Sequence, residues 1–126
     1  MTKDEINNLV MKFLVEEKGF DLNCRNQYGH TILHRIHSYR IKYKNRIALA
    51  KAMIKIGADV NAIDNLGWTP MHYQCSFTSD IEMINVLLDN WADVNAKTHI
   101  GATPLSQAIL HQRPSVITLL KERGAK

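Results

Sequence analysis

The sequence predicts an all-α solenoid in which short pairs of helices stack side by side. One six-residue motif recurs three times, at residues 29–34 (GHTILH), 67–72 (GWTPMH) and 101–106 (GATPLS). A second motif alternates with it, at residues 19–23 (GFDLN), 57–61 (GADVN) and 91–95 (WADVN). Two motifs interleaved in the same order three times indicate repeated units, each of which buries an apolar face against its neighbour.

The composition agrees with one folded domain. The 126 residues are 45% apolar and 22% charged, and no Pro- or Gly-rich linker divides them. Cys24 and Cys75 are too few for a disulfide scaffold, so we expect a cytoplasmic or nuclear location. The polar start at residues 1–8 is not a secretory signal, and no apolar run is long enough to span a membrane. We expect a monomer.

The expected helices follow the chain in order. An opening helix is expected over residues 4–18, where apolar side chains recur at helical spacing. Three later helices are expected to start at the threonine of the first motif, because a threonine hydroxyl caps free backbone N–H groups. Two of these threonines are followed by proline, which is favoured at the first helical position. The threonines are Thr31, Thr69 and Thr103, and the prolines are Pro70 and Pro104.

A second helix is expected after each of these three. Apolar residues recur at helical spacing over 83–88 and again over 116–120. One opening helix and two helices in each of three units make about seven, joined by short turns with essentially no sheet.

The two motifs resemble those of the ankyrin repeat family. In that family Gly-x-Thr-Pro-Leu-His opens a first helix, and Gly-Ala-Asp-Val-Asn-Ala follows a second helix and enters a β-turn finger. The resemblance covers nearly the whole chain and implies a single domain. Its divisions are an N-terminal helix and first finger (1–24), repeat 1 (25–62), repeat 2 (63–96) and repeat 3 (97–126).

Several positions depart from the family pattern. Repeat 1 carries about five extra residues around Ser38 to Arg46, which should either lengthen its second helix backward or form a protruding basic loop. Trp91 stands where a glycine usually ends the second helix. That helix end therefore lacks the residue that most readily adopts the left-handed backbone conformation. Asn26 in repeat 1 and Thr98 in repeat 3 stand at the position that Asp64 occupies in repeat 2, and all three side chains can accept turn hydrogen bonds.

The resemblance implies a protein-binding module that is not an enzyme. Such arrays bind a partner protein along a concave face made by the fingers and the first helices. Tyr28, Leu66 and Ile100 are equivalent positions and would form an exposed apolar row beside Trp68, unless adjacent fingers bury part of it. The residues predicted to contact the partner are Tyr28, His30, Tyr39, Asn65, Leu66, Trp68, Phe77, His99, Ile100 and His111.

Two alternative functions remain open. The same surface would also serve a viral or intracellular-bacterial factor that binds host proteins. The basic tract of Arg40, Lys42, Lys44 and Arg46 could instead contact nucleic acid or an acidic surface. A net charge of +4 is mild for a nucleic-acid binder, so we expect no nucleic-acid partner.

No cofactor or metal is expected. His30, His34 and His37 are spaced to share a helix face, but no cysteine or carboxylate joins them as a ligand set. His34 and His72 belong to the repeat motif, in which the imidazole bonds the capping threonine. The chain has no phosphate loop, nucleophile elbow or paired-carboxylate motif, so no catalytic residue is expected.

Overall fold

The computed structural model describes residues 2, 19, 21–38 and 43–126. The expected helix over 4–18 lies outside these residues, as do Tyr39, Arg40 and Lys42. The described chain forms helices α2 (Ile32–Arg35), α3 (Tyr43–Lys55), α4 (Pro70–Phe77), α5 (Ile81–Asp89), α6 (Pro104–Leu110) and α7 (Pro114–Glu122), and a 3-10 turn, η2 (Ile36–Ser38), follows α2. No strand occurs among these residues, so the predicted all-α solenoid is confirmed.

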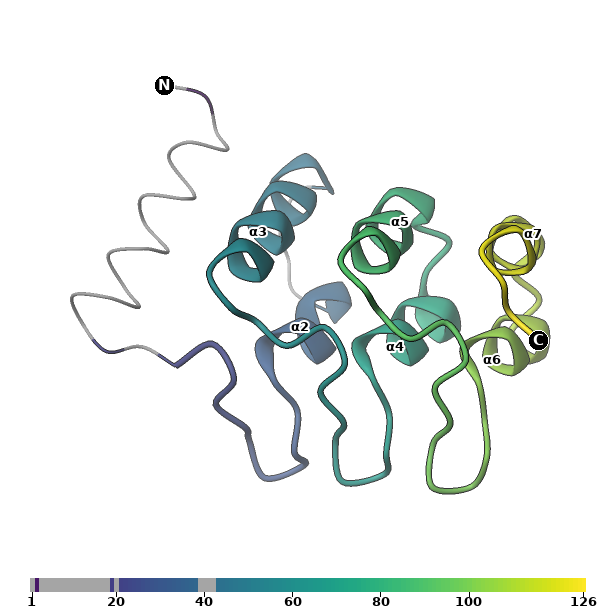
Figure 1. Cartoon of the computed structure of the whole chain (residues 1–126), viewed down its shortest axis with the longest axis horizontal. Coiled ribbons are helices and arrows are strands. Elements are labelled where there is room, and N and C mark those ends of the chain that lie inside the picture. The colour runs from purple at the N-terminus through teal and green to yellow at the C-terminus, as the bar shows by residue number, and fades with distance from the viewer. Residues whose placement is uncertain (1, 3–18, 20, 39–42) are drawn as a thin grey trace.

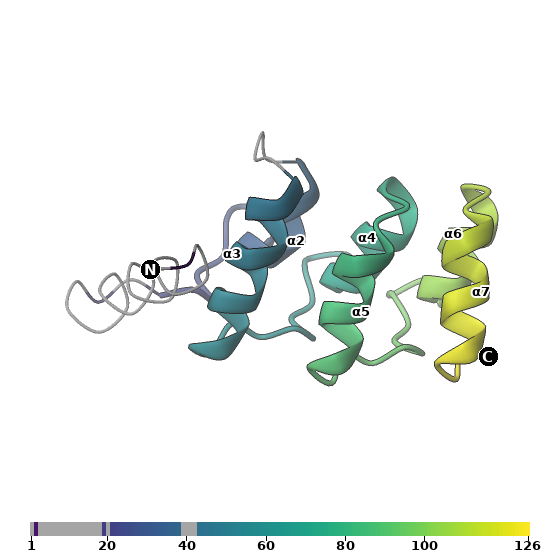
Figure 2. The ribbon, with the colours of Figure 1, turned by 90° about the horizontal axis from the view of Figure 1, so that it is seen from above.

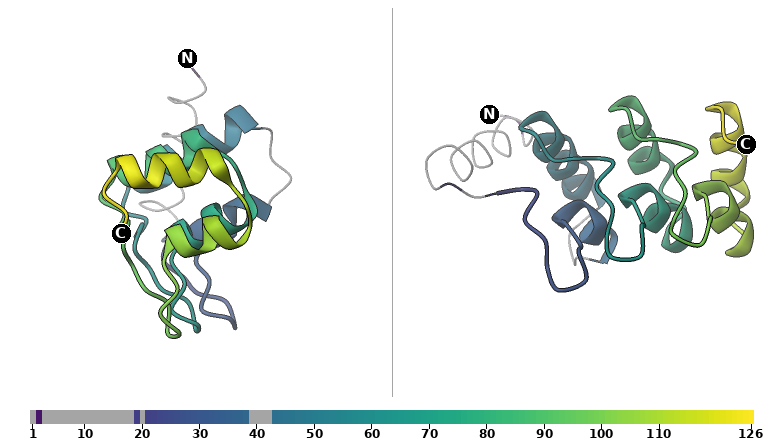
Figure 3. Two further views of the ribbon diagram at one scale, coloured as in Figure 1. Left: turned by 90° about the vertical axis from the view of Figure 1, so that its right-hand side faces the viewer. Right: turned by 60° about the horizontal axis from the view of Figure 1, so that its bottom comes forward.

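The helices stand in two rows. Figure 1 shows the first helices α2, α4 and α6 beneath the second helices α3, α5 and α7, with each unit beside the next. Long hairpin fingers precede the first helices, and Figure 3 shows all of them projecting from the same side of the stack. The fingers and the first helices therefore share one face of the molecule. We call it the finger face, made by residues 24–38, 62–78 and 97–113.

Helices α4 and α6 begin as the sequence predicts. The Thr69 hydroxyl accepts the backbone N–H of His72 at the start of α4, and the His72 Nδ1 accepts the backbone N–H of Thr69 at 3.0 Å. The His72 Nε2 donates to the Ala102 carbonyl of the next repeat at 3.0 Å. In repeat 3 the Ser106 hydroxyl accepts the Thr103 N–H at 2.8 Å. The histidine thus caps its own helix and also ties two repeats together.

Repeat 1 is the irregular repeat. Its second helix α3 has 13 residues, whereas α5 and α7 have 9 each. All three end two residues before the second motif position, so the additional turn lies at the start of α3 (Figure 2). The extra residues therefore lengthen the second helix backward, which was one of the two expected outcomes.

One apolar core runs through all the repeats. Leu33, Met71 and Leu105 from the first helices pack with Met53, Leu87 and Leu120 from the second helices, all of them buried. Each repeat supplies only part of this core, so the stack is stable as a unit and not repeat by repeat. Cys75 is also fully buried here, and burial raises the pKa of its thiol to about 12.

Asparagines tie each second motif to the next. The Asn61 Oδ1 accepts the Asp93 N–H at 2.8 Å, while its Nδ2 donates to the Trp91 carbonyl at 2.9 Å. Asn23 makes the same pair of bonds to Asp59 and Gly57. The motif asparagine is therefore a bridge between repeats, because both ends of its amide satisfy backbone groups of the neighbouring unit.

Candidate protein-binding face

An exposed apolar row lies along the tips of the three fingers. Tyr28 is 56% exposed, Leu66 65% and Ile100 91%. The fingers are joined edge to edge by backbone bonds, from Asn65 N–H to the Tyr28 carbonyl (3.0 Å) and from His99 N–H to the Leu66 carbonyl (3.1 Å). These bonds hold the three side chains in series, and neighbouring fingers leave more than half of each residue open to solvent.

In each finger turn, one side chain accepts hydrogen bonds from backbone N–H groups. The Asn26 Oδ1 accepts the N–H groups of Tyr28 and His30, and the Thr98 hydroxyl accepts that of Ala102. Asp64 does the same in the middle finger, where its Oδ1 accepts from Leu66 and Trp68, both at 2.9 Å. The three residues therefore accept turn hydrogen bonds, as the sequence predicts, and place the apolar row.

A pocket of about 340 Å³ opens between the first two fingers. Tyr28 and Leu66 are its exposed apolar lining residues, and His30, Asp64 and Tyr73 are buried or half-buried. Its lining residues are Tyr28, His30, Asp64, Asn65, Leu66 and Tyr73.

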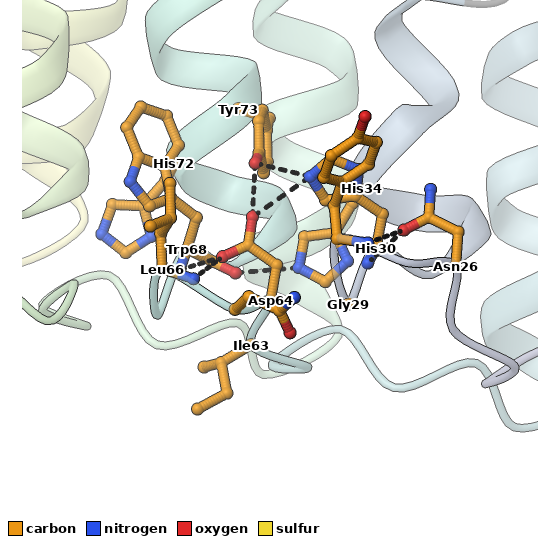
Figure 4. A network of polar contacts seen from close by, with 12 residues as sticks. Asn26, Gly29, His30, His34, Ile63, Asp64, Leu66, Trp68, His72 and Tyr73 are labelled. Atoms are coloured by element: carbon orange, nitrogen blue, oxygen red, sulfur yellow. Dashed lines mark hydrogen bonds and ion pairs between the residues drawn. The ribbon is translucent and has the colours of Figure 1, made fainter.

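The inner wall contains a hydrogen-bond network. The Tyr73 hydroxyl donates to the Asp64 Oδ2, and the His30 Nε2 lies 3.3 Å from the same oxygen and 2.9 Å from the Tyr73 hydroxyl (Figure 4). Burial would raise the pKa of Asp64, but the bonds from Tyr73, Trp68 and Leu66 outweigh it and hold the pKa below its usual value. Burial and the Asp64 bond together raise the pKa of Tyr73.

This network leaves Asp64 with its acceptor positions used. Its side chain is only 1% exposed, and both of its oxygens already take hydrogen bonds. The pocket therefore offers a partner side chain aromatic and aliphatic surface. The Asp64 carboxylate holds the middle finger and Tyr73 in place. The sequence reasoning assigned Asp64 to its turn but missed Tyr73, because that position carries no motif.

Two residues predicted as partner contacts are less available than expected. The His30 side chain is only 12% exposed and belongs to the Asp64 network. Trp68 is half-buried, with its ring centroid 4.9 Å from that of Tyr73 and 5.8 Å from that of His72. A contact role for either residue stays a prediction.

Stacked rings continue the finger face along the first helices. His37 stacks on Tyr73 and on Phe77, with centroids 5.6 Å and 5.4 Å apart and interplanar angles of 13° and 9°. Phe77 is 53% exposed, and its ring lies 5.9 Å from that of His111 in the next repeat. Asn65 and His99 are exposed in the fingers, as expected. Tyr39 lies outside the described residues.

The basic tract of repeat 1 is described only in part. Lys44 and Arg46 fall within α3, whereas Arg40 and Lys42 lie outside the described residues. The tract as a nucleic-acid site therefore stays a hypothesis from the sequence.

The histidines of the repeat motif are structural. Burial lowers the pKa of His34 and of His72. In both, Nε2 donates to a carbonyl of the next repeat and Nδ1 accepts a threonine N–H, which requires the neutral imidazole. Within the described ranges, no three His, Cys, Asp or Glu residues form a group that could hold a metal ion. The same ranges contain no helix long and apolar enough to cross a membrane.

Trp91 is an exposed aromatic residue that the predicted contact set does not include. It is 88% exposed and has a φ of 71°, in the left-handed region that favours glycine. The signal was present in the sequence, since Trp91 replaces the motif glycine, and the sequence analysis used it only to describe a helix end.

The stacked two-helix units and projecting fingers define a helical repeat solenoid. The family model described as ankyrin repeats (3 copies) matches residues 38–126, and the chain belongs to the ankyrin repeat family. Repeats of this family generally mediate protein–protein interaction and are typically not enzymes.

Two relatives are similar over part of the chain. An ankyrin repeat protein of Rickettsia felis is 39% identical over 66 residues, which are 52% of this chain and 28% of the relative. An ankyrin repeat protein of fowlpox virus is 43% identical over 51 residues, which are 40% of this chain and 10% of the relative. The chain thus spans well under half the length of either protein.

Proposed function

We propose that this chain binds a partner protein on its finger face, with the exposed apolar row as the main contact. The carrying observation is that Tyr28, Leu66 and Ile100 are held in series by the joined fingers and yet stay more than half exposed. Large exposed apolar side chains at equivalent points of successive repeats favour a binding surface, because solvation of such a row is unfavourable.

The chemistry of the described residues favours binding over catalysis. Asp64 has its oxygens occupied by hydrogen bonds, and the buried Cys75 has a raised thiol pKa, so neither is poised as a base or nucleophile. His34 and His72 have both ring nitrogens engaged in the packing of the repeats.

Capture of the partner tests this proposal. The wild-type chain and a Leu66→Ser/Ile100→Ser variant should be used as bait in the same lysate, with crosslinking and quantitative mass spectrometry as the measurement. Lys55→Ser, on the exposed side of α3, is the matched control. Recovery of the partner should fall at least about tenfold with the finger variant and stay unchanged with the control. Equal recovery by both variants would place the contact elsewhere.

A second candidate is that the partner belongs to a host cell. Both relatives come from organisms that replicate inside host cells, one a bacterium and one a virus. The same capture, done in parallel with lysates of a host cell and of the producing organism, separates the two cases by which lysate yields the finger-dependent partner.

A further inference from the structure

The acids of residues 43–126 are unevenly placed: the second helices and their turns carry acids and cations together, whereas the finger face carries cations and one buried acid. On the finger face the described cations are Arg25, Arg35, Lys97 and Arg113, and the only acid is the buried Asp64. The other acids of residues 43–126 belong to the second helices and the turns beside them, and they are Asp59, Asp80, Glu82, Asp89, Asp93 and Glu122. The described finger face is therefore free of exposed carboxylates across three repeats.

Two of these cations, Arg25 and Lys97, lie in the fingers, and Arg35 lies at the end of a first helix. The Arg25 guanidinium donates to the carbonyls of Gly29 (3.0 Å) and Ile63, so it bridges the first two fingers beside the pocket while staying exposed. Arg35 ends α2, which packs against α4, the helix that carries Tyr73. Lys97 is exposed in the third finger. A carboxylate approaching the apolar row thus meets positive charge and no opposing acid.

The pocket itself is suited to an uncharged group. Its rim is the Tyr28 ring and the Leu66 side chain, and the polar atoms of Asp64 on its wall are satisfied by hydrogen bonds within the protein. Its volume of about 340 Å³ accommodates a large aliphatic or aromatic side chain with room to spare.

We propose that the finger face binds an acidic segment of its partner protein, with one large apolar side chain of that segment seated in the pocket between the first two fingers. This rests on the proposed function and adds the chemistry of the partner: acidic residues placed on either side of an apolar anchor. The apolar side chain supplies affinity, and the flanking carboxylates supply selectivity and speed of association.

A protein segment fits this surface better than a nucleic acid does. Arg25 is engaged with two carbonyls, and Arg113 donates to the Ser76 carbonyl and the Ser79 hydroxyl. Among the described residues this leaves Arg35 and Lys97 as the finger-face cations without such bonds, which is few for a phosphate backbone. Of the three residues of the apolar row only Tyr28 carries a ring, and the aliphatic Leu66 and Ile100 offer nucleobases nothing to stack on.

The test is selection of peptides by the full chain. A phage-displayed library of random dodecapeptides is panned on the immobilised protein at physiological salt, and clones that also bind the Leu66→Ser/Ile100→Ser variant are removed. We expect a consensus that is net acidic and carries a Leu, Ile, Met, Phe or Trp. The best peptide is then synthesised with a fluorescent label, together with a twin in which each carboxylate residue is lysine, and affinity is measured by anisotropy.

Two charge-reversal variants provide the matched control. Arg35→Glu/Lys97→Glu changes the finger face, and Lys51→Glu/Lys55→Glu makes the same change of net charge on exposed positions of α3. The finger-face pair should weaken the peptide about tenfold, the α3 pair less than about twofold, and the lysine twin should not bind measurably. Circular dichroism checks that both variants are folded.

The outcomes separate this inference from the proposed function. A neutral or basic consensus that still depends on Leu66 would overturn the acidic partner and leave the binding face standing. The absence of any finger-dependent peptide would overturn both. Equal loss in the two charge variants would also overturn the inference, as would displacement of the peptide by a single-stranded DNA oligonucleotide at equal concentration.

Discussion

Replacing Trp91 by glycine should stabilise the protein. Trp91 lies two residues beyond the end of α5 with a φ of 71°, whereas the equivalent positions in the flanking repeats are Gly57 and Gly124, with φ values of 113° and 94°. An L-residue in the left-handed region costs about 1–2 kcal/mol, because its Cβ crowds the backbone. The hydrogen bond from the Asn61 Nδ2 to the Trp91 carbonyl does not involve the indole and should survive the change.

The expected gain follows from two opposing contributions. Relief of the left-handed strain contributes about 1–2 kcal/mol, and the greater freedom of glycine in the unfolded chain removes about 0.5–1 kcal/mol. Little packing is lost, since Trp91 is 88% exposed. The net gain should be about 0.5–1 kcal/mol, which for 126 residues corresponds to a rise in Tm of about 2–4 °C.

Urea denaturation and a thermal melt of Trp91→Gly measure this gain. Trp91→Ala is the matched control, because it removes the same indole and keeps the Cβ, and its stability should stay within about 0.5 kcal/mol of wild type. If alanine stabilised the chain as much as glycine, or if glycine lowered its stability, backbone strain at position 91 would not be the cause. Partner capture by Trp91→Gly also shows whether this exposed ring takes part in binding.

Four further outcomes are expected. First, stability should be complete above about pH 6.5 and fall below it, because the pKa values of His34 and His72 are lowered by burial and the unfolded chain binds their protons more readily. Each histidine contributes a slope of up to about 1.4 kcal/mol per pH unit until its lowered pKa is reached, and urea titrations from about pH 7.5 to 5.5 should lose part of that slope in His72→Ser. Second, Asn61→Ala should cost about 1–2 kcal/mol in a urea titration through its two lost inter-repeat bonds, and Asn61→Asp, which keeps the acceptor, should recover part of this. Third, Gly67→Ala should destabilise more than Gly101→Ala in thermal melts, because a Cβ at position 67 would lie 2.5 Å from the His99 ring, whereas one at 101 meets nothing within 4 Å at a similar φ. Fourth, Trp68→Ala should fold but lose about 2 kcal/mol by urea denaturation, since its half-buried ring packs on Tyr73; an unchanged midpoint would show that this packing does not contribute to stability.

The helix starts could be predicted from sequence because they are local. A capping threonine, a proline and the histidine or serine three residues after the threonine act within one turn, so the residues that decide the structure are neighbours in the chain. The backward extension of α3 was one of two expectations, and spacing alone did not choose between them. The C-terminal ends of α3, α5 and α7 are aligned with the repeat motif. Additional residues can therefore be added only at the start of α3 or in the loop before it.

Only those residues of the candidate site that recur at equivalent positions of the repeats could be predicted from the sequence. Tyr28, Leu66 and Ile100 follow from the repeat alignment, because equivalent positions must lie in a row when repeats stack. The network of Tyr73, Asp64 and His30 does not repeat, since its members occupy three different positions of the unit and come from two repeats. A pattern search compares each residue with its equivalents and therefore passes over a contact that occurs once.

That single network also explains why the pocket lies between the first two fingers. The residue equivalent to Tyr73 is Arg35 in repeat 1 and Gln107 in repeat 3, and neither supplies a phenol that could donate to the turn residue of its own finger. In repeat 2 the phenol fixes the Asp64 carboxylate from the helix side, while His30 reaches it from the preceding finger. The middle finger is therefore held by its own helix through Tyr73 and by the preceding finger through His30. The Asp64 carboxylate and the Tyr73 phenol of this wall are bonded to each other, while the rim residues Tyr28 and Leu66 stay exposed, which is the arrangement that an apolar anchor from a partner requires.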